Sequence, residues 1–154
     1  MLTVSLTESD ILTALRGFIL SVIPDIEVVK GLDNGVAPPK GQYILLTPLF
    51  ACRLATNTTN YLQTHQVITQ PQKYAMQIDC YGEKSSDHAS LLTTLLRDEY
   101  ACSQFPENIQ PLYADDPKLM PFVNAEQLYE KRWVITVYFQ YNPVVTISYE
   151  NNQP

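Results

Sequence analysis

The chain has 154 residues, a length that fits one domain and lets folding bury about 68–70% of the surface exposed by the unfolded chain. Sixteen acidic and ten basic residues give a formal net charge of −6, and the basic residues are scattered, which argues against binding nucleic acid through its phosphates. Only 17% of residues are charged and ten are tyrosines. This composition indicates either a surface partly covered by other protein or one that is polar but uncharged.

The first predicted element is an amphipathic helix over residues 8–23. Thr7 can cap it, and Pro24 ends it. Its apolar face repeats at steps of three and four residues, through Ile11, Leu12, Leu15, Phe18, Ile19 and Val22. A short strand over 26–30 follows, and turn residues then predict a loop over 31–41.

Two strand regions occupy the middle of the chain. The first covers residues 42–55, with a bulge or an edge position expected at Pro48 because proline cannot donate to a strand ladder. Residues 56–60 are expected to form a polar tip. The second strand region covers 61–81 with a break at 70–72, and its last part buries the alternating side chains of Tyr74, Met76, Ile78 and Cys80.

A second helix is predicted over residues 86–102, with an apolar stripe of Leu91, Leu92, Leu95, Leu96 and Tyr100. Four prolines predict an irregular segment over 103–126, and alternation predicts a long strand over 127–141. A polar tail follows, frayed over 146–154, although Val144, Val145 and Ile147 favour a short edge strand. The expected fold class is therefore α+β: one domain over 1–154, with a mostly antiparallel sheet and two helices on one face.

Neither histidine has the neighbours that catalysis or metal binding requires. His65 and His88 lack a second ligand at suitable spacing. Asp115 and Asp116 can hold a hard cation, but a turn in which their side chains bond nearby backbone amides is favoured about five to one. No phosphate-binding loop or nucleophile elbow occurs. We therefore expect no enzyme activity, no metal and no cofactor.

The three cysteines, Cys52, Cys80 and Cys102, have no metal-ligand spacing, and their odd number does not form a disulfide framework. This favours assembly in the reduced cytoplasm. The N-terminal segment lacks the basic start of a signal peptide, and no apolar stretch is long enough to cross a membrane. No membrane partner is expected.

Successive blocks over about residues 26–145 resemble a family of phage neck and tail-terminator proteins. The most specific blocks are Tyr113-Ala114-Asp115-Asp116-Pro117 and Gln140-Tyr141-Asn142-Pro143. The others are Gly31-Leu32-Asp33-Asn34, Pro39-Lys40-Gly41, Arg53-Leu54-Ala55-Thr56-Asn57, Gln77-Ile78-Asp79-Cys80-Tyr81-Gly82, Arg97-Asp98-Glu99-Tyr100 and Tyr129-Glu130-Lys131-Arg132-Trp133.

The resemblance implies a tail-terminator-like fold and a virion structural protein without catalytic residues. Such a protein forms a ring, commonly of six subunits, that caps the tail tube and joins it to the head connector or stopper. The implied partners are copies of itself, the tube protein and the connector, with genomic DNA passing through the lumen unbound. The acidic excess would suit such a channel. The implied location is the neck of the virion, at the top of the tail, after assembly in the host cytoplasm.

The polar stretch 56–72 can project as a long hairpin towards a neighbour or the tube. The candidate contact residues are Thr56, Asn57, Thr58, Tyr61 and Gln70 in this stretch, together with Tyr113, Asp115 and Asp116 in the acidic loop. An alternative function is a monomeric module that binds a protein or a small ligand through the loop 103–126.

Overall fold

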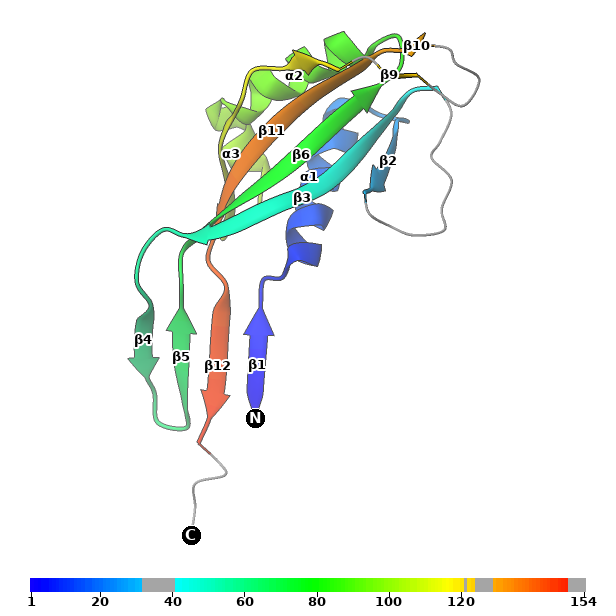
Figure 1. Ribbon diagram of the computed structural model, residues 1–154. Helices are drawn as coiled ribbons and strands as arrows, with labels where there is room; N and C mark the ends of the chain where they lie inside the picture. The colour runs from blue at the N-terminus through cyan, green and yellow to red at the C-terminus, as the bar shows by residue number, and fades with distance from the viewer. Residues whose placement is uncertain (32–40, 121, 124–128, 150–154) are drawn as a thin grey trace.

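The computed structural model describes residues 1–31, 41–120, 122–123 and 129–149. The chain forms a larger body, made of a sheet and helices, and a narrower arm that projects from one end of it (Figure 1). Strands predominate, their pairing is mostly antiparallel, and the helices pack on a sheet. The expected α+β class is confirmed.

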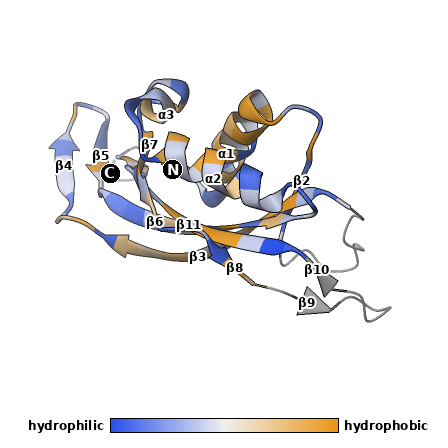
Figure 2. Cartoon of the chain, turned by 90° about the horizontal axis from the view of Figure 1, so that it is seen from above, coloured by the Kyte–Doolittle hydropathy of each residue, from blue (hydrophilic) through white to orange (hydrophobic). Residues whose placement is uncertain are grey.

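The main sheet supports the body. Its strands, in spatial order, are β2 (Glu27–Lys30), β3 (Tyr43–Arg53), β6 (Gln72–Tyr81), β11 (Arg132–Tyr141) and β7 (Ile109–Ala114), with β8 (Lys118–Leu119) also pairing with β11. Only β2 and β3 run parallel. β9 (Phe122–Val123) and β10 (Tyr129–Glu130) pair separately. The three helices lie together on one face of the main sheet (Figure 2). The other face, which no described helix covers, is here called the open face.

Helix α1 (Glu8–Val22) confirms the first predicted helix. Its first turn is closed by Thr7, whose backbone N–H donates to Asp10 Oδ2 at 2.7 Å. Its buried side chains are Ile11, Leu15, Phe18 and Ile19.

The core lies between the helices and alternate residues of the two central strands. Those residues are Tyr74, Met76, Ile78 and Cys80 of β6 and Ile135, Val137 and Phe139 of β11. The alternation predicted for β11 is confirmed. In β6 the predicted core residues are buried, but Ala75, Asp79 and Tyr81 on the opposite face are buried as well. In β3, the ladder shifts register between Pro48 and Phe50, which confirms the expected bulge.

The second predicted helix is interrupted. The structure has α2 (Ser85–Leu96) and a separate α3 (Glu99–Gln104), because Asp98 adopts an extended conformation and caps α3 by accepting a hydrogen bond from the Tyr100 N–H at 2.9 Å. The predicted stripe is therefore wrong at its ends: Leu91 is 38% exposed and Tyr100 45% exposed. The buried face of α2 instead contains Ser85, Ala89, Leu92, Thr93 and Leu96.

The segment 103–126 is not an irregular loop throughout. Residues 109–114 form β7, which pairs with β11 at one edge of the main sheet. An edge strand tolerates proline, so Pro111 does not prevent pairing. Part of the loop on which the alternative binding function depended is therefore occupied by strands, in β7, β8 and β9.

The arm is a second antiparallel sheet that the sequence did not predict. Its strands, in spatial order, are β1 (Leu2–Ser5), β12 (Val144–Ser148), β5 (His65–Thr69) and β4 (Thr58–Tyr61). The projecting hairpin is present, but its tip is at residues 62–64, where the Leu62 N–H donates to the His65 carbonyl at 2.8 Å, and not at 56–60.

The end of the chain also differs from expectation. Residues 146–148 belong to β12 and are not a frayed tail; residues 150–154 lie outside the described residues, as does most of the predicted loop 31–41. β12 is an inner strand between β1 and β5, where an edge strand was expected. It has this position because the N-terminal residues supply its second partner.

Candidate interaction surfaces

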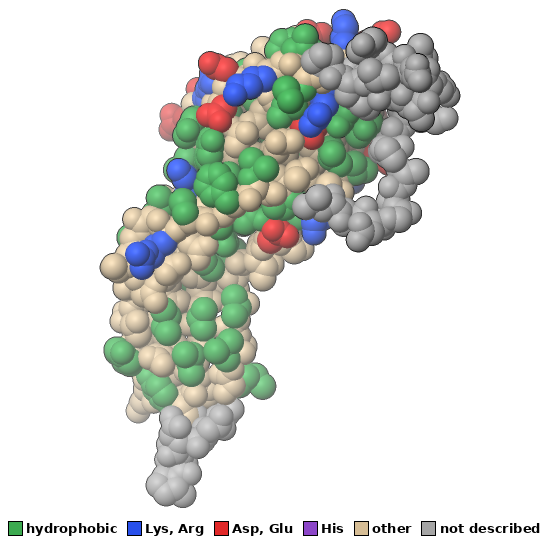
Figure 3. All heavy atoms as spheres, viewed as in Figure 1, with side chains coloured by type: hydrophobic (Ala, Val, Ile, Leu, Met, Phe, Trp, Pro, Cys, Tyr) green, Lys and Arg blue, Asp and Glu red, His purple; other side chains and the backbone are tan. Residues whose placement is uncertain are grey.

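The arm has no formally charged side chain. Its strands and the turn between β4 and β5 cover residues 2–5, 58–69 and 144–148, and none of these is Lys, Arg, Asp or Glu. Figure 3 shows hydrophobic side chains on the visible side of the arm, whereas charged side chains gather on the body. Depletion of charge is typical of a surface that becomes buried against another protein.

The strand register divides the arm residues between two faces. One face, here called the apolar arm face, contains Leu2, Val4, Tyr61, Ile68, Val145 and Ile147, with Thr59 and Gln66. The opposite face is mainly threonine and serine. An antiparallel sheet usually packs one face on a core, yet Leu2 is 59%, Val4 54% and Tyr61 76% exposed. The apolar arm face is therefore suited to contact another molecule.

A shallow hollow lies where the apolar arm face meets the body. Val4, Ile68 and Val145 line it from the arm, and Leu6 and Tyr141 line it from the adjoining segments. Asn57, Gln70 and Gln72 also line the hollow, so its wall is apolar only in part.

The predicted contact residues of the hairpin lie along the arm. Gln70 Nε2 donates to Asn57 Oδ1 at 2.7 Å, so these two side chains tie the beginning and end of the hairpin together. Thr56 is exposed close by, and Thr58 begins β4 opposite Thr69. Tyr61 lies at the other end of β4. The structure thus gives Asn57 and Gln70 a role in holding the hairpin and leaves Tyr61 available for contact.

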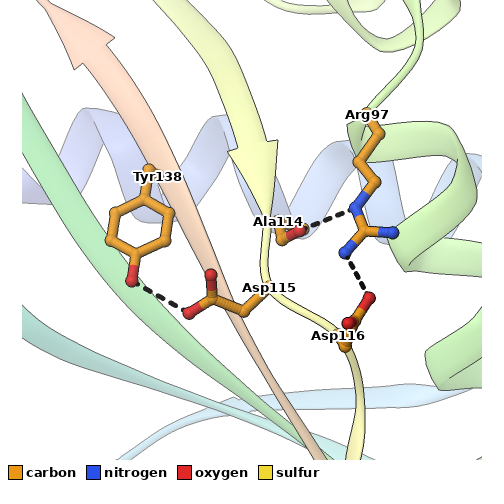
Figure 4. A network of polar contacts seen from close by, with 5 residues as sticks. All are labelled: Arg97, Ala114, Asp115, Asp116 and Tyr138. Carbon is orange, nitrogen blue, oxygen red and sulfur yellow. Dashed lines mark hydrogen bonds and ion pairs between the residues drawn. The ribbon is translucent and has the colours of Figure 1, made fainter.

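Tyr113, Asp115 and Asp116 lie on the body. Tyr113 stacks on Tyr138 with ring centroids 4.7 Å apart, and the Tyr138 hydroxyl donates to Asp115 Oδ2 at 2.9 Å. Asp116 Oδ1 accepts from Arg97 at 2.8 Å (Figure 4). Backbone amides were the expected partners of both carboxylates, and this expectation is wrong. Asp115 instead bonds a side chain of β11, and Asp116 bonds a side chain at the end of α2. These interactions fix the segment after β7.

Arg97, which lies between α2 and α3, also binds the end of β7. Its Nε donates to the carbonyl of Ala114 at 2.7 Å, beside its ion pair with Asp116 (Figure 4). The Asp115 carboxylate raises the pKa of Tyr138 to about 12, chiefly through their hydrogen bond. The phenol is therefore a neutral donor over the ordinary pH range.

A second polar cluster lies on the open face of the main sheet. Asp79 is only 1% exposed, accepts two hydrogen bonds from Gln77 and faces the Arg132 guanidinium at 3.4 Å. Burial raises the pKa of Asp79, while Arg132 and Gln77 act in the opposite direction. Arg132 also lies over the ring of Tyr81, 5.8 Å from its centroid. The alternation in β6 indicated that Asp79 points away from the core, but not that it is buried.

Tyr81 extends this cluster across the sheet. Its ring stacks on that of Tyr43, with centroids 4.4 Å apart and planes 9° apart. Both rings are nearly buried, at 8% and 5% exposure.

A further contact of the same face joins Lys73 and Tyr138. The Lys73 Nζ lies over the Tyr138 ring, 5.3 Å from its centroid. The open face is thus held by aromatic and charged contacts and has no clustered nucleophile and base among the described residues.

The histidines and cysteines lie apart from one another. Thr64 Oγ1 and His65 Nδ1 are 2.9 Å apart in the arm, and burial lowers the pKa of His88 in α2. Cys52 is exposed, while burial raises the pKa of the Cys80 thiol to about 12. Within the described ranges, no three His, Cys, Asp or Glu side chains gather to hold a metal ion. No helix there has the length and apolarity to cross a membrane.

One of three comparisons with known proteins identifies a family. A search of curated proteins gives no match. One solved structure aligns with 89% of this chain and 96% of its own, at 10% identity and a TM-score of 0.47, a likeness too low to support an argument. The family model for phage neck terminator proteins matches residues 9–153, nearly the whole chain. The chain therefore belongs to the phage neck terminator protein family, whose members are structural components of the virion neck.

Proposed function

We propose that this protein assembles into a ring of six subunits that caps the phage tail tube and joins it to the head connector. The family match over residues 9–153 carries this proposal. The work of such a protein is to bind subunits, so the absence of a paired nucleophile and base among the described residues is compatible with a role without catalysis.

The arm supports the ring because it offers the kind of surface that repeated subunits need. A ring forms through heterologous contacts, in which one surface of each copy meets a different surface of the next. Each copy carries a net charge of −6, so copies repel one another on average. A surface without formal charge lets them approach without desolvating charged side chains. In the described chain, the arm is such a surface.

Capping can be tested with tail tubes purified from a phage that lacks this protein. Electron microscopy should show added protein at one end of each tube, and averaged end views give the number of subunits. Deletion of the gene should give tubes of uncontrolled length and heads without joined tails. Normal tails and normal joining after deletion would refute the proposal.

A charged residue on the apolar arm face gives a sharper version of this test. Val4→Glu adds a carboxylate to a side chain that is 54% exposed and should reduce capping. Ser90→Glu adds the same charge to an exposed position of α2 and serves as the matched control, with capping unchanged. Equal capping by both variants would mean that the apolar arm face does not contribute to assembly.

The acidic excess leads to a proposal about the lumen. If the ring surrounds the passing genome, weak repulsion by acidic side chains keeps DNA from adhering to the wall. Double-stranded DNA should therefore show no measurable retention on assembled rings at physiological salt. Retention that weakens steeply as salt increases would reveal a basic lumen and refute this part of the proposal.

A further inference from the structure

The arm sheet ends in two strands that are left open for pairing. β1 and β4 each have a strand on one side only, within the described part of the chain. Natural proteins usually block such edges with charged residues, prolines or bulges. β1 and β4 contain no charged residue and no proline, and their registers run without a shift. The edge strands are short, with four residues each, but no charge, proline or bulge within them opposes strand addition.

The hydrogen-bond pattern shows which backbone groups point outward. The Ser148 N–H donates to the Met1 carbonyl at 2.9 Å, and hydrogen-bonded pairs alternate along an antiparallel ladder. The N–H and C=O groups of Leu2 and Val4 therefore point away from β12. In the same way, the bond from the Leu62 N–H to the His65 carbonyl directs the groups of Thr59 and Tyr61 away from β5.

The directions of the two edge strands are complementary. Three successive antiparallel pairings separate β1 from β4, so the two strands run in opposite directions (Figure 1). Two copies placed side by side in the same orientation therefore bring β1 of one against β4 of the next as an antiparallel pair. In the simplest register, Leu2 faces Tyr61 and Val4 faces Thr59. All four residues lie on the same face of the arm sheet, so the apolar arm face continues from copy to copy.

We propose that β1 of each copy pairs with β4 of the next copy, so that the arms join into one continuous antiparallel sheet around the ring. This inference rests on the proposed ring and identifies the contact that builds it. The occupant is a second copy of this chain, because direction, side-chain face and outward hydrogen-bond groups match between the two edges of a single arm. The match is heterologous, so it propagates around a ring and does not end at a dimer.

Disulfide trapping tests the pairing directly. In a Cys52→Ser background, which removes the exposed native thiol, Leu2→Cys and Tyr61→Cys are combined in one chain. Directly opposed residues of an antiparallel hydrogen-bonded pair have Cα atoms about 5.5 Å apart, within the range that a disulfide can bridge. Mild oxidation of protein assembled on tail tubes should give a ladder of covalent multimers. Each variant with only one of the two new cysteines should give monomers only, and Cys80 and Cys102 are common to all variants.

The single variants also detect other arrangements. A covalent dimer from Leu2→Cys alone would show that β1 pairs with β1, and one from Tyr61→Cys alone would show that β4 pairs with β4. Either result would overturn the proposal. Rings that cap tubes normally but give no ladder would overturn the edge pairing and leave the proposed function standing. Failure of the unmodified protein to form rings or caps at all would refute both the edge pairing and the proposed function.

A backbone change gives an independent test. Thr59→Pro deletes an N–H that points outward, so the ladder with β5 keeps its bonds and the edge loses a donor to the next copy. Thr59→Val keeps the N–H and a β-branched side chain and is the matched control. We expect ring assembly to weaken about tenfold in the proline variant and to remain unchanged in the valine variant. Circular dichroism and thermal melting report whether each variant is folded. Folded proline variants that assemble normally would contradict the pairing.

Discussion

Replacing Arg132 with methionine should destabilise the protein strongly, because the change removes the cation beside a buried carboxylate. Asp79 is 1% exposed, and Arg132 Nη2 lies 3.4 Å from its Oδ2. Without the guanidinium, the two hydrogen bonds from Gln77 are the remaining described contacts that favour the charged form of Asp79. Methionine preserves much of the aliphatic volume, so the effect reports mainly on charge.

Removing one partner of a buried ion pair typically destabilises a protein by about 3–5 kcal/mol. The side chain of Arg132 is 25% exposed and Gln77 remains in place, so we expect a value near the lower limit, about 3 kcal/mol. For a domain of this size, that corresponds to a decrease in the melting temperature of roughly 6–12 °C. Urea unfolding gives the free energy directly, and thermal melting gives the temperature.

The loss should depend on pH with a definite sign. Burial already raises the pKa of Asp79, and removal of Arg132 should raise it further. The folded state then binds a proton more readily than the unfolded state, so stability falls as pH rises between the unfolded and folded pKa values of this carboxyl. The destabilisation should be largest at neutral pH and should shrink as pH approaches 4.

Lys131→Met is the matched control, because it removes one positive charge from an exposed neighbouring position that makes no described ion pair with Asp79. It should leave the free energy of unfolding nearly unchanged. Adding Asp79→Asn to Arg132→Met should restore part of the lost stability. A loss below about 1 kcal/mol for Arg132→Met, or one that does not change with pH, would refute the reasoning.

Three further outcomes follow from the structure. Phe139→Ala removes a fully buried ring and should lower the free energy of unfolding by about 3–5 kcal/mol in urea titration; a loss below about 1 kcal/mol would be inconsistent with its burial. The pKa of Tyr138 is raised to about 12 by Asp115, so the stability from this bond should be present below pH 10 and lost toward pH 12, and Tyr138→Phe should remove one late-titrating tyrosine from the ultraviolet titration. Cys52 should react quickly with a thiol reagent and Cys80 only on unfolding, so Cys52→Ser should abolish the fast phase.

The periodicity of apolar residues predicted helices and strands correctly where a single repeat ran through the whole element. The three- and four-residue repeat of α1 and the alternation of β11 predicted the core side correctly, because each buries one continuous stripe. The alternation of β6 also predicted the core side, but Ala75, Asp79 and Tyr81 on the opposite side are buried too. Proline was a reliable signal for the bulge in β3 but a misleading one in β7, because a proline can occupy an edge strand that has a partner on only one side.

The candidate contact residues were predicted in two groups, and the structure gives them different surroundings. Asn57 and Gln70 bond each other at the base of the hairpin, whereas Tyr113, Asp115 and Asp116 contact β11 and Arg97 on the body. Apolar and hydroxyl residues alternate in Leu2-Thr3-Val4-Ser5, which is the pattern of a strand with two different faces. Four residues are too few to distinguish a strand from an irregular end.

The sequence by itself determined the family, the fold class and the absence of charge in the segments that became the arm. Only the tertiary structure decided that residues from the two ends of the chain and from its middle join in one sheet. Strand pairing depends on contacts between residues far apart in the chain, and their register is set by which partners meet, not by local preference. For the same reason, the burial of Asp79 and the open edges of β1 and β4 became visible only once the strands were placed side by side.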